Sequence, residues 1–250
     1  MQTNRPKTAR DPVAVVIPFH KSNPDVNELL SLQRCCNILK PYPRFLVVGD
    51  SLDTRRLQQT DDTMQIVRFP DIFFSSWNGY NLLCRSPEFY GRFLNYEHIL
   101  IHQLDCYIFR DELRHWCEQD YDYIGAAWPR YEHLTESKKW YFKAPFLKIF
   151  LRQTAQGGFS LRRVAVFHAA SLRQARLLRY IKNLPEDVYW STIGVRLYRP
   201  FKVAGIREAV RFAFDASPEL CFRMNDGQLP FGCHGWYGKH ADFWKDKIER

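Results

Sequence analysis

Short apolar runs alternate with longer segments of helical pattern in the first half of the chain. The runs are rich in β-branched residues and end at Pro, Gly or polar residues, as buried strands do. We expect strands at Val13–Ile17, Arg44–Gly49 and Gln65–Phe69, and helices over 25–39 and 78–94, the latter broken by a Ser-Pro pair. Strands that alternate with helices predict an α/β fold with a mostly parallel sheet flanked by helices, similar to the Rossmann folds.

The domain organisation predicted from the chain is simple. Its 250 residues are enough for one large domain with its own core. Without a linker, an internal repeat or a low-complexity run, we expect a single domain over 12–250, preceded by a flexible basic N-terminus over 1–11. The alternation fades after residue 128, and Ser160–Lys182 is expected to form a long basic helix.

Charge and composition restrict the partners. A formal net charge of +9 favours anionic ligands, such as nucleotide diphosphates, acidic glycans or an anionic membrane surface. No nucleic-acid-binding motif is present, so we expect no nucleic acid partner. The aromatic share of 16% suits a cleft that stacks on rings and equally an aromatic core.

Cysteine usage and hydropathy indicate the compartment. The seven cysteines form no CxxC pair and lie mostly in apolar contexts, which is typical of reduced buried thiols. The first eleven residues lack an apolar signal core, and the run at 13–19 is too short to span a bilayer. We therefore expect a cytoplasmic protein. Residues 138–152, basic and aromatic, predict either a peripheral contact with the inner face of an anionic membrane or a lid packed on the domain.

One carboxylate interrupts the apolar stretch over 99–109. Burying Asp105 requires compensation by a cation, an arginine or a metal. Ligands of parallel sheets bind outside the carboxyl ends of the strands, where Pro18–His20, Gly49-Asp50 and Asp105 are expected to gather. Hard cations such as Mg²⁺ or Mn²⁺ prefer carboxylate oxygen, so Asp105 is either a metal ligand or the partner of an arginine or a loop.

Three later motifs carry polar groups suited to catalysis. Gly157-Gly158 allows close approach of a ligand backbone, with Ser160 expected to cap the following helix, or it forms only a tight loop. The pair Glu186-Asp187 is either a source of a general base or a solvated helix start. His234, between aromatics and glycines, is either a second metal ligand or an ordinary loop histidine.

The ordered set of motifs resembles a known pattern. Over residues 13–236 the chain resembles bacterial GT-A-type glycosyltransferases, and more closely a glycosyltransferase-like family of unknown function. That family carries a Gln-x-Asp strand, a Gly-Gly-Phe-Ser-Leu-Arg loop, a Pro-Glu-Asp loop and a late His-Gly, as found here at 103–105, 157–162, 185–187 and 234–235.

The resemblance implies roles for individual residues. Asp105 and His234 would hold Mn²⁺ or Mg²⁺, with Gln103 where many members have the first acid. Asp187 would be the catalytic base, and Glu186 beside it would hold donor or acceptor hydroxyls. The rest of the donor site would consist of Pro18, Phe19 and His20 at the base and ribose, Tyr80 and Asn81 at the nucleotide, and Gly157 and Gly158 at the sugar.

The same resemblance implies a function. We expect transfer of a sugar from a nucleotide-diphosphate sugar, most simply a UDP-sugar, to a hydroxyl of a glycan or lipid-linked acceptor in bacterial surface polysaccharide synthesis. Inversion at the anomeric carbon is expected. Two alternatives stay open: a non-catalytic nucleotide- or glycan-binding module on the same scaffold, and a metal-dependent phosphoesterase.

Overall fold

The computed structural model describes residues 11–129, 154–178, 184–198 and 201–249. The segment over 138–152 and most of the predicted basic N-terminus lie outside the described residues; Asp11 begins the first strand. Within the described part no helix is both long and apolar enough to cross a bilayer. All seven cysteines are free thiols, and all but Cys117 are buried.

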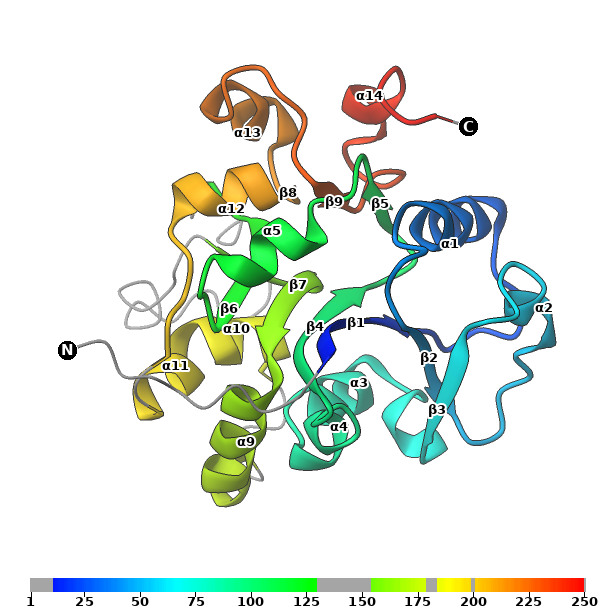
Figure 1. Ribbon diagram of the computed structural model, residues 1–250, viewed down its shortest axis with the longest axis vertical. Coiled ribbons are helices and arrows are strands. Elements are labelled where there is room, and N and C mark those ends of the chain that lie inside the picture. Colours follow the sequence, from blue (N-terminus) through cyan, green and yellow to red (C-terminus); the bar gives the residue numbers. More distant parts are fainter. Residues whose placement is uncertain (1–10, 130–153, 179–183, 199–200, 250) are drawn as a thin grey trace.

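One nine-stranded sheet organises the molecule (Figure 1). Its order is β3-β2-β1-β4-β7-β6-β8-β9-β5. The strands are β1 (Asp11–Pro18), β2 (Arg44–Gly49), β3 (Gln65–Phe69), β4 (Tyr96–His102), β5 (Cys106–Ile108), β6 (Tyr123–Ala127), β7 (Thr154–Arg163), β8 (Ala213–Phe214) and β9 (Gly232–His234). Strand β7 pairs antiparallel with β4 and with β6, and β5 pairs antiparallel with β9. The other pairings are parallel. The expected mostly parallel α/β sheet is confirmed.

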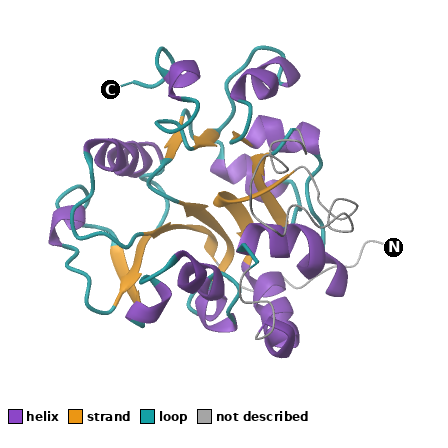
Figure 2. Cartoon of the chain, turned by 180° about the vertical axis from the view of Figure 1, so that it is seen from behind, coloured by secondary structure: helices purple, strands orange, loops and turns teal. Residues whose placement is uncertain are grey.

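Helices and connecting segments flank the sheet (Figure 2). The helices are α1 (Val26–Ile38), α2 (Arg55–Gln58), α3 (Trp77–Leu83), α4 (Pro87–Gly91), α5 (Leu113–Glu118), α9 (Val164–Leu178), α10 (Glu186–Tyr189), α11 (Val195–Leu197), α12 (Ile206–Phe212), α13 (Pro218–Met224) and α14 (Ala241–Trp244). A 3₁₀ turn, η1 (Asp71–Phe73), precedes α3, and a π-helical segment, η2 (Trp190–Gly194), follows α10.

Alternation along β1 explains the two main layers of core. Val13, Val15 and Ile17 pack into one cluster with residues of α1 and α5, whereas Ala14 and Val16 pack into another with residues of α4 and α9. A strand covered on both faces is apolar at every position, which is why its sequence is a continuous run. A third cluster, with residues of α12, α13 and α14, closes the β8–β9 end.

Local capping explains the helix starts in the first half. Asp25 accepts a hydrogen bond from the Glu28 amide, and the Glu28 side chain accepts one from the Asp25 amide, which is a capping box at α1. The predicted break in the second helical segment is confirmed, because Ser86 accepts from the Phe89 amide and Pro87 opens α4.

The expected helix over 160–182 is wrong at its beginning. Residues up to Arg163 belong to β7, which pairs with β4 on one side and β6 on the other, and α9 starts only at Val164. Ser160 therefore caps no helix, and its hydroxyl donates to the Gly157 carbonyl instead. The polar residues of this strand are tolerated because tertiary contacts pair them, with Arg162 fully buried against Glu186.

Asp105 lies after β4 rather than inside it. The stretch over 99–109 divides into the end of β4, a turn, and β5, which crosses to the far edge of the sheet. The turn keeps the Asp105 side chain partly exposed, at 35% of its full surface, so its carboxylate is not the buried lone charge that the apolar run predicts.

Candidate functional site

Strand register brings Asp105 and His234 together. Cys106 of β5 is paired with His234 of β9, and the Asp105 carbonyl accepts a hydrogen bond from the Gly235 amide. The two side chains meet beside this ladder, with His234 Nε2 lying 3.3 Å from Asp105 Oδ2. Residues 129 positions apart in the chain thus form one corner of the site.

Asp215 is the third acidic or basic group of this corner, and the sequence reasoning missed it. Phe214 pairs with Cys233, so the next residue of the chain emerges beside His234. Asp215 Oδ1 lies 2.9 Å from His234 Nδ1, and Asp215 Oδ2 accepts a 2.6 Å hydrogen bond from the Trp128 indole. Asp215 ends an apolar run over 212–214, the same pattern that singled out Asp105, and that signal could have found it.

Amide side chains complete the surroundings of His234. Gln103 Oε1 lies 3.3 Å and Gln156 Nε2 lies 3.2 Å from His234 Nε2. Gly158 packs so closely that an added Cβ would lie 2.3 Å from Gln103 Oε1 and 2.7 Å from the His234 ring. A side chain at this position would displace Gln103 or the His234 ring.

Electrostatics at this corner favour positive charge. Burial alone lowers the pKa of His234, but the nearby carboxylates of Asp105 and Asp215 outweigh it and raise that pKa to about 9. Cys106 also lies within ligand distance of Asp105 and His234. Burial raises the pKa of its thiol well above the ordinary value, which leaves it protonated and a poor ligand.

The donor set fits a hard divalent cation. Within the described residues, Asp105, Cys106 and His234 place one potential ligand atom each within 4.8 Å of one another. A carboxylate oxygen and an imidazole nitrogen suit Mn²⁺, and open positions left by so small a protein set suit phosphate oxygens and water. Asp215 lies on the other side of the His234 ring, and a carboxylate in that position is a common outer partner of a metal-binding histidine.

A cavity of about 530 Å³ opens next to this corner. Six of the nine predicted donor-site residues line it: Pro18, Phe19, His20, Tyr80, Gln103 and Asp105. Trp77, which is 49% exposed, Phe74 and Tyr237 add aromatic walls that the sequence reasoning did not single out. Its size is that of typical small-molecule sites, and its aromatic lining offers faces on which a flat ring can stack.

Glu186 and Asp187 occupy different environments although they are adjacent. Glu186 is buried, accepts a 2.7 Å hydrogen bond from Arg162, and packs on Gly157, where an added Cβ would lie 1.8 Å from its Oε1. Arg162 also donates to Tyr90, so the ion pair has further polar support. This geometry makes Glu186 part of a buried ion pair under the site, and contact with a substrate hydroxyl stays a prediction.

Asp187 is partly exposed and lies within electrostatic reach of Asp215 and His234. Burial, followed by the like charges of Glu186 and Asp215, raises the pKa of Asp187 to about 7. Its Oδ1 accepts a 2.6 Å hydrogen bond from the Val188 amide, which fixes the carboxyl group at the start of α10. A carboxylate with this pKa is suited to accept a proton at neutral pH.

Asn81 and the two glycines lie beneath this arrangement. The Asn81 side chain accepts from the Glu186 amide at 2.6 Å and donates to the Trp77 carbonyl at 2.7 Å, so it ties α3 to α10. Its amide is thus taken up by main-chain groups, and the predicted contact with a nucleotide stays a prediction. Gly157 and Gly158 are buried under Glu186 and His234, and their contact with a sugar stays a prediction.

Comparison of the sequence with known protein families gives a match. Residues 63–234, more than half of the chain, match the family described as "Protein of unknown function (DUF5672)". The chain belongs to the DUF5672 family. The matched segment runs from just before β3 to His234 and so includes Asp105, Asp187 and Asp215. No curated protein sequence matches this DUF5672 chain.

Several solved structures similar to this DUF5672 member are glycosyltransferases. The galactosyltransferase LgtC, in complex with donor and acceptor sugar analogs, is 10% identical with a TM-score of 0.56, covering 93% of this chain and 94% of LgtC. Core-mannan synthase A from Aspergillus fumigatus, in a Mn/GDP form, is 11% identical with a TM-score of 0.52, covering 82% and 75%. Mouse xyloside xylosyltransferase 1 is 9% identical with a TM-score of 0.53, covering 90% and 97%.

These similarities establish the fold. The chain has the GT-A fold expected from its sequence, a single mostly parallel sheet flanked by helices. Identities of 9–13% carry no residue roles from one protein to another, so the roles here rest on the geometry of this chain.

Proposed function

We propose that this protein is a glycosyltransferase that moves a sugar from a nucleotide-diphosphate sugar, a UDP-sugar in its simplest form, to a hydroxyl of a glycan or lipid-linked acceptor. The observation that carries the proposal is the convergence of Asp105, His234 and Asp187 beside an aromatic-lined cavity in a GT-A fold. We place this reaction at the cytoplasmic face of a bacterial membrane, in surface polysaccharide synthesis.

Asp105 and His234 would hold Mn²⁺ or Mg²⁺, with Gln103 as a neighbouring oxygen ligand. Bound there, the cation would neutralise negative charge on the diphosphate of the donor. The cavity would take the base and ribose against Phe19, Tyr80 and Trp77. Lys21 also lines the cavity, where it forms an ion pair with Glu28 at 2.5 Å and interacts electrostatically with Asp105.

Asp187 would take the proton of the acceptor hydroxyl, because its carboxyl group is held by the Val188 amide and its pKa lies near neutrality. Removal of that proton makes the oxygen a better nucleophile toward the anomeric carbon, and attack from the face opposite the diphosphate would invert the configuration. Glu186 would support Asp187 from below through its ion pair with Arg162.

Thermal unfolding with a panel of nucleoside diphosphates and nucleotide sugars, with and without Mn²⁺, tests the proposal. One nucleoside diphosphate is expected to raise the melting temperature only when Mn²⁺ is present. At about 100 times its dissociation constant a ligand stabilises the fold by about 2.7 kcal/mol. Asp105→Ala is expected to abolish the shift.

Two results would count against the proposal. Absence of a shift with every nucleotide, Mn²⁺ included, would exclude the donor site. Release of inorganic phosphate or nucleoside monophosphate from a nucleotide sugar, in place of a nucleoside diphosphate, would indicate a phosphoesterase.

A further inference from the structure

We infer that Asp215, clamped by Trp128, is a positioning residue that fixes His234 as a metal ligand. The inference rests on the metal site of the proposed function and assigns to it a residue outside the ligand set. Asp215 would act through His234 and would not touch the cation itself.

The two ring nitrogens of His234 face different groups. Nδ1 lies 2.9 Å from Asp215 Oδ1, and Nε2 faces Asp105 Oδ2 and Gln103 Oε1, each at 3.3 Å. Because a carboxylate only accepts hydrogen bonds, it keeps a proton on Nδ1, so Nε2 is the nitrogen that a cation would bind in place of a proton. That side is where Asp105 lies.

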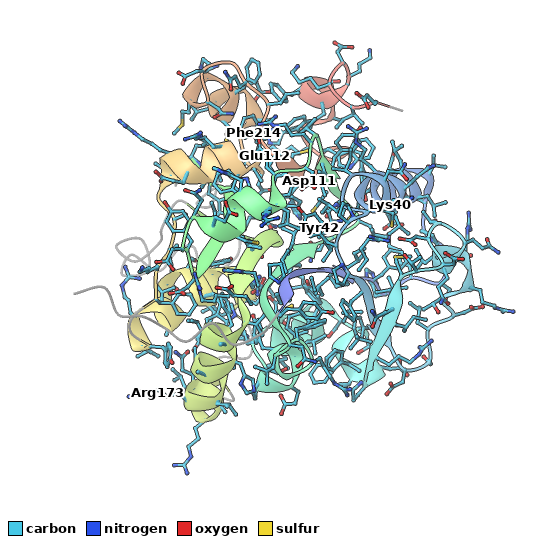
Figure 3. The ribbon with its side chains drawn as sticks, viewed as in Figure 1. Lys40, Tyr42, Asp111, Glu112, Arg173 and Phe214 are labelled. Atoms are coloured by element: carbon cyan, nitrogen blue, oxygen red, sulfur yellow. The ribbon has the colours of Figure 1, made fainter. Side chains whose placement is uncertain are left out.

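Both oxygens of Asp215 are engaged. Oδ2 accepts the 2.6 Å hydrogen bond from Trp128 Nε1, and Oδ1 lies within hydrogen-bond distance of His234 Nδ1. The clamp is built from the sheet, since Phe214 pairs with Ala127 on one side and Cys233 on the other. Trp128 is 7% exposed and follows Ala127 directly, so it reaches Asp215 from a rigid strand end. Figure 3 labels Phe214 near the base of α13, beside α12.

Substitution of Trp128 distinguishes a positioning role of Asp215 from simple attraction between its charge and the cation. A carboxylate near a cation attracts it whatever its orientation, whereas the indole carries no charge and donates its N–H to Asp215. Loss of the indole N–H would therefore loosen the orientation of Asp215 and leave its charge unchanged. An effect of Trp128 on metal affinity is the signature of positioning.

Mn²⁺ alone is the probe, added to the full chain without nucleotide, with unbound Mn²⁺ measured by electron paramagnetic resonance. Asp215→Ala is expected to weaken Mn²⁺ binding about 10- to 100-fold, the usual loss when the outer partner of a ligand is removed. Asp215→Asn and Trp128→Phe are expected to give smaller losses. Asp62→Asn, at an exposed aspartate, is the matched control and should bind as the wild type does.

A double-mutant cycle tests whether Asp215 acts through His234. Asp215→Ala should weaken binding far less in a His234→Ala background than in the wild type. Electron–nuclear double resonance on protein labelled with ¹⁵N-histidine should show Mn²⁺–nitrogen coupling in the wild type and a reduced coupling in Asp215→Ala. A role limited to fold stability would change the melting temperature without changing this coupling.

The outcomes distinguish the inference from the proposed function. Unchanged Mn²⁺ affinity in His234→Ala would remove His234 from the metal site and overturn both. Weak binding in His234→Ala with wild-type binding in Asp215→Asn and Trp128→Phe would overturn the positioning role alone. Equal losses from Asp215→Ala in both backgrounds would do the same, because they would reflect charge and not the orientation of the ring.

Discussion

At the scale of single residues, Asp187 makes the most direct prediction about chemistry. Burial, Glu186 and Asp215 raise its pKa to about 7, so the carboxylate form that accepts a proton is lost as the pH falls below that value. We expect kcat/KM for sugar transfer to fall toward tenfold per pH unit below about pH 7 and to level off above it. Initial rates across this range measure the profile.

The matching substitution is Asp187→Asn, which keeps the shape of the side chain and removes the base. Transfer should slow by about 10²- to 10⁴-fold, with little change in nucleotide-induced stabilisation. Wild-type turnover by an Asp187→Asn protein that binds donor normally would exclude Asp187 as the base.

At the scale of elements, β7 is the strand on which the site rests. Gly157 lies under Glu186, and both Glu186 and its partner Arg162 are buried, so neither can move aside for an added methyl group. We expect Gly157→Ala to separate this ion pair and to lower the free energy of unfolding by about 3–5 kcal/mol, as breaking a buried pair does. Urea denaturation measures the change.

Gly238 offers a matched control for this prediction. A Cβ at Gly238 would lie 3.5 Å from the Gly235 carbonyl oxygen, which is ordinary contact. Gly238→Ala should therefore stay close to wild-type stability. If the Gly157→Ala and Gly238→Ala proteins unfold at the same urea concentration, the packing of Glu186 on β7 is not under the constraint described.

At the scale of the whole molecule, two histidines in the central strand β4 predict acid sensitivity. Burial lowers the pKa of His98 to about 4 and that of His102 to about 3. In the unfolded chain these two histidines become protonated from about pH 6.5 downward, whereas in the folded chain they stay neutral until about pH 4. The stability contributed by these two histidines is thus complete above pH 6.5 and falls as the pH drops, by up to about 1.4 kcal/mol per unit for each histidine.

Urea midpoints at about pH 7 and about pH 5 measure this loss. His98→Asn should reduce the pH dependence by about one proton, and His115→Asn, at an exposed histidine, should leave it unchanged. Equal pH dependence in the wild type and His98→Asn would show that His98 is not held neutral by the fold.

Two surface features of the whole molecule, its positive charge and the predicted membrane contact, were inferred from the sequence. The net charge of +9 is partly displayed by α9, where Arg173 projects away from the body of the molecule (Figure 3). The predicted membrane contact depends on 138–152, outside the described residues, and stays a prediction.

The first half of the chain could be predicted from sequence because its signals are local. Apolar runs define β1 and β2, and the shorter Ile-Val pair lies in β3. Asp25 and Ser86 cap α1 and α4 with their own neighbours. Asp105 was found because it ends such a run. His234 was singled out by its place among aromatics and glycines, but only the ordered motifs paired it with Asp105, since nothing near it in the chain indicates its partner.

Tertiary structure alone decided the remaining features, because their partners are distant in the chain. Arg162 in β7 has the local pattern of a basic helix, and its hydrogen bonds to the distant Glu186 and Tyr90 help to make it acceptable inside a sheet. Asp215 ends a short apolar run, but only the pairing of the preceding strand β8 with β6 and β9 places its side chain beside His234 and Trp128. The sequence by itself determined the α/β architecture and which residues carry charge. The packing of the sheet decided which of those charges meet, since a charge is stable there only beside the group that compensates it.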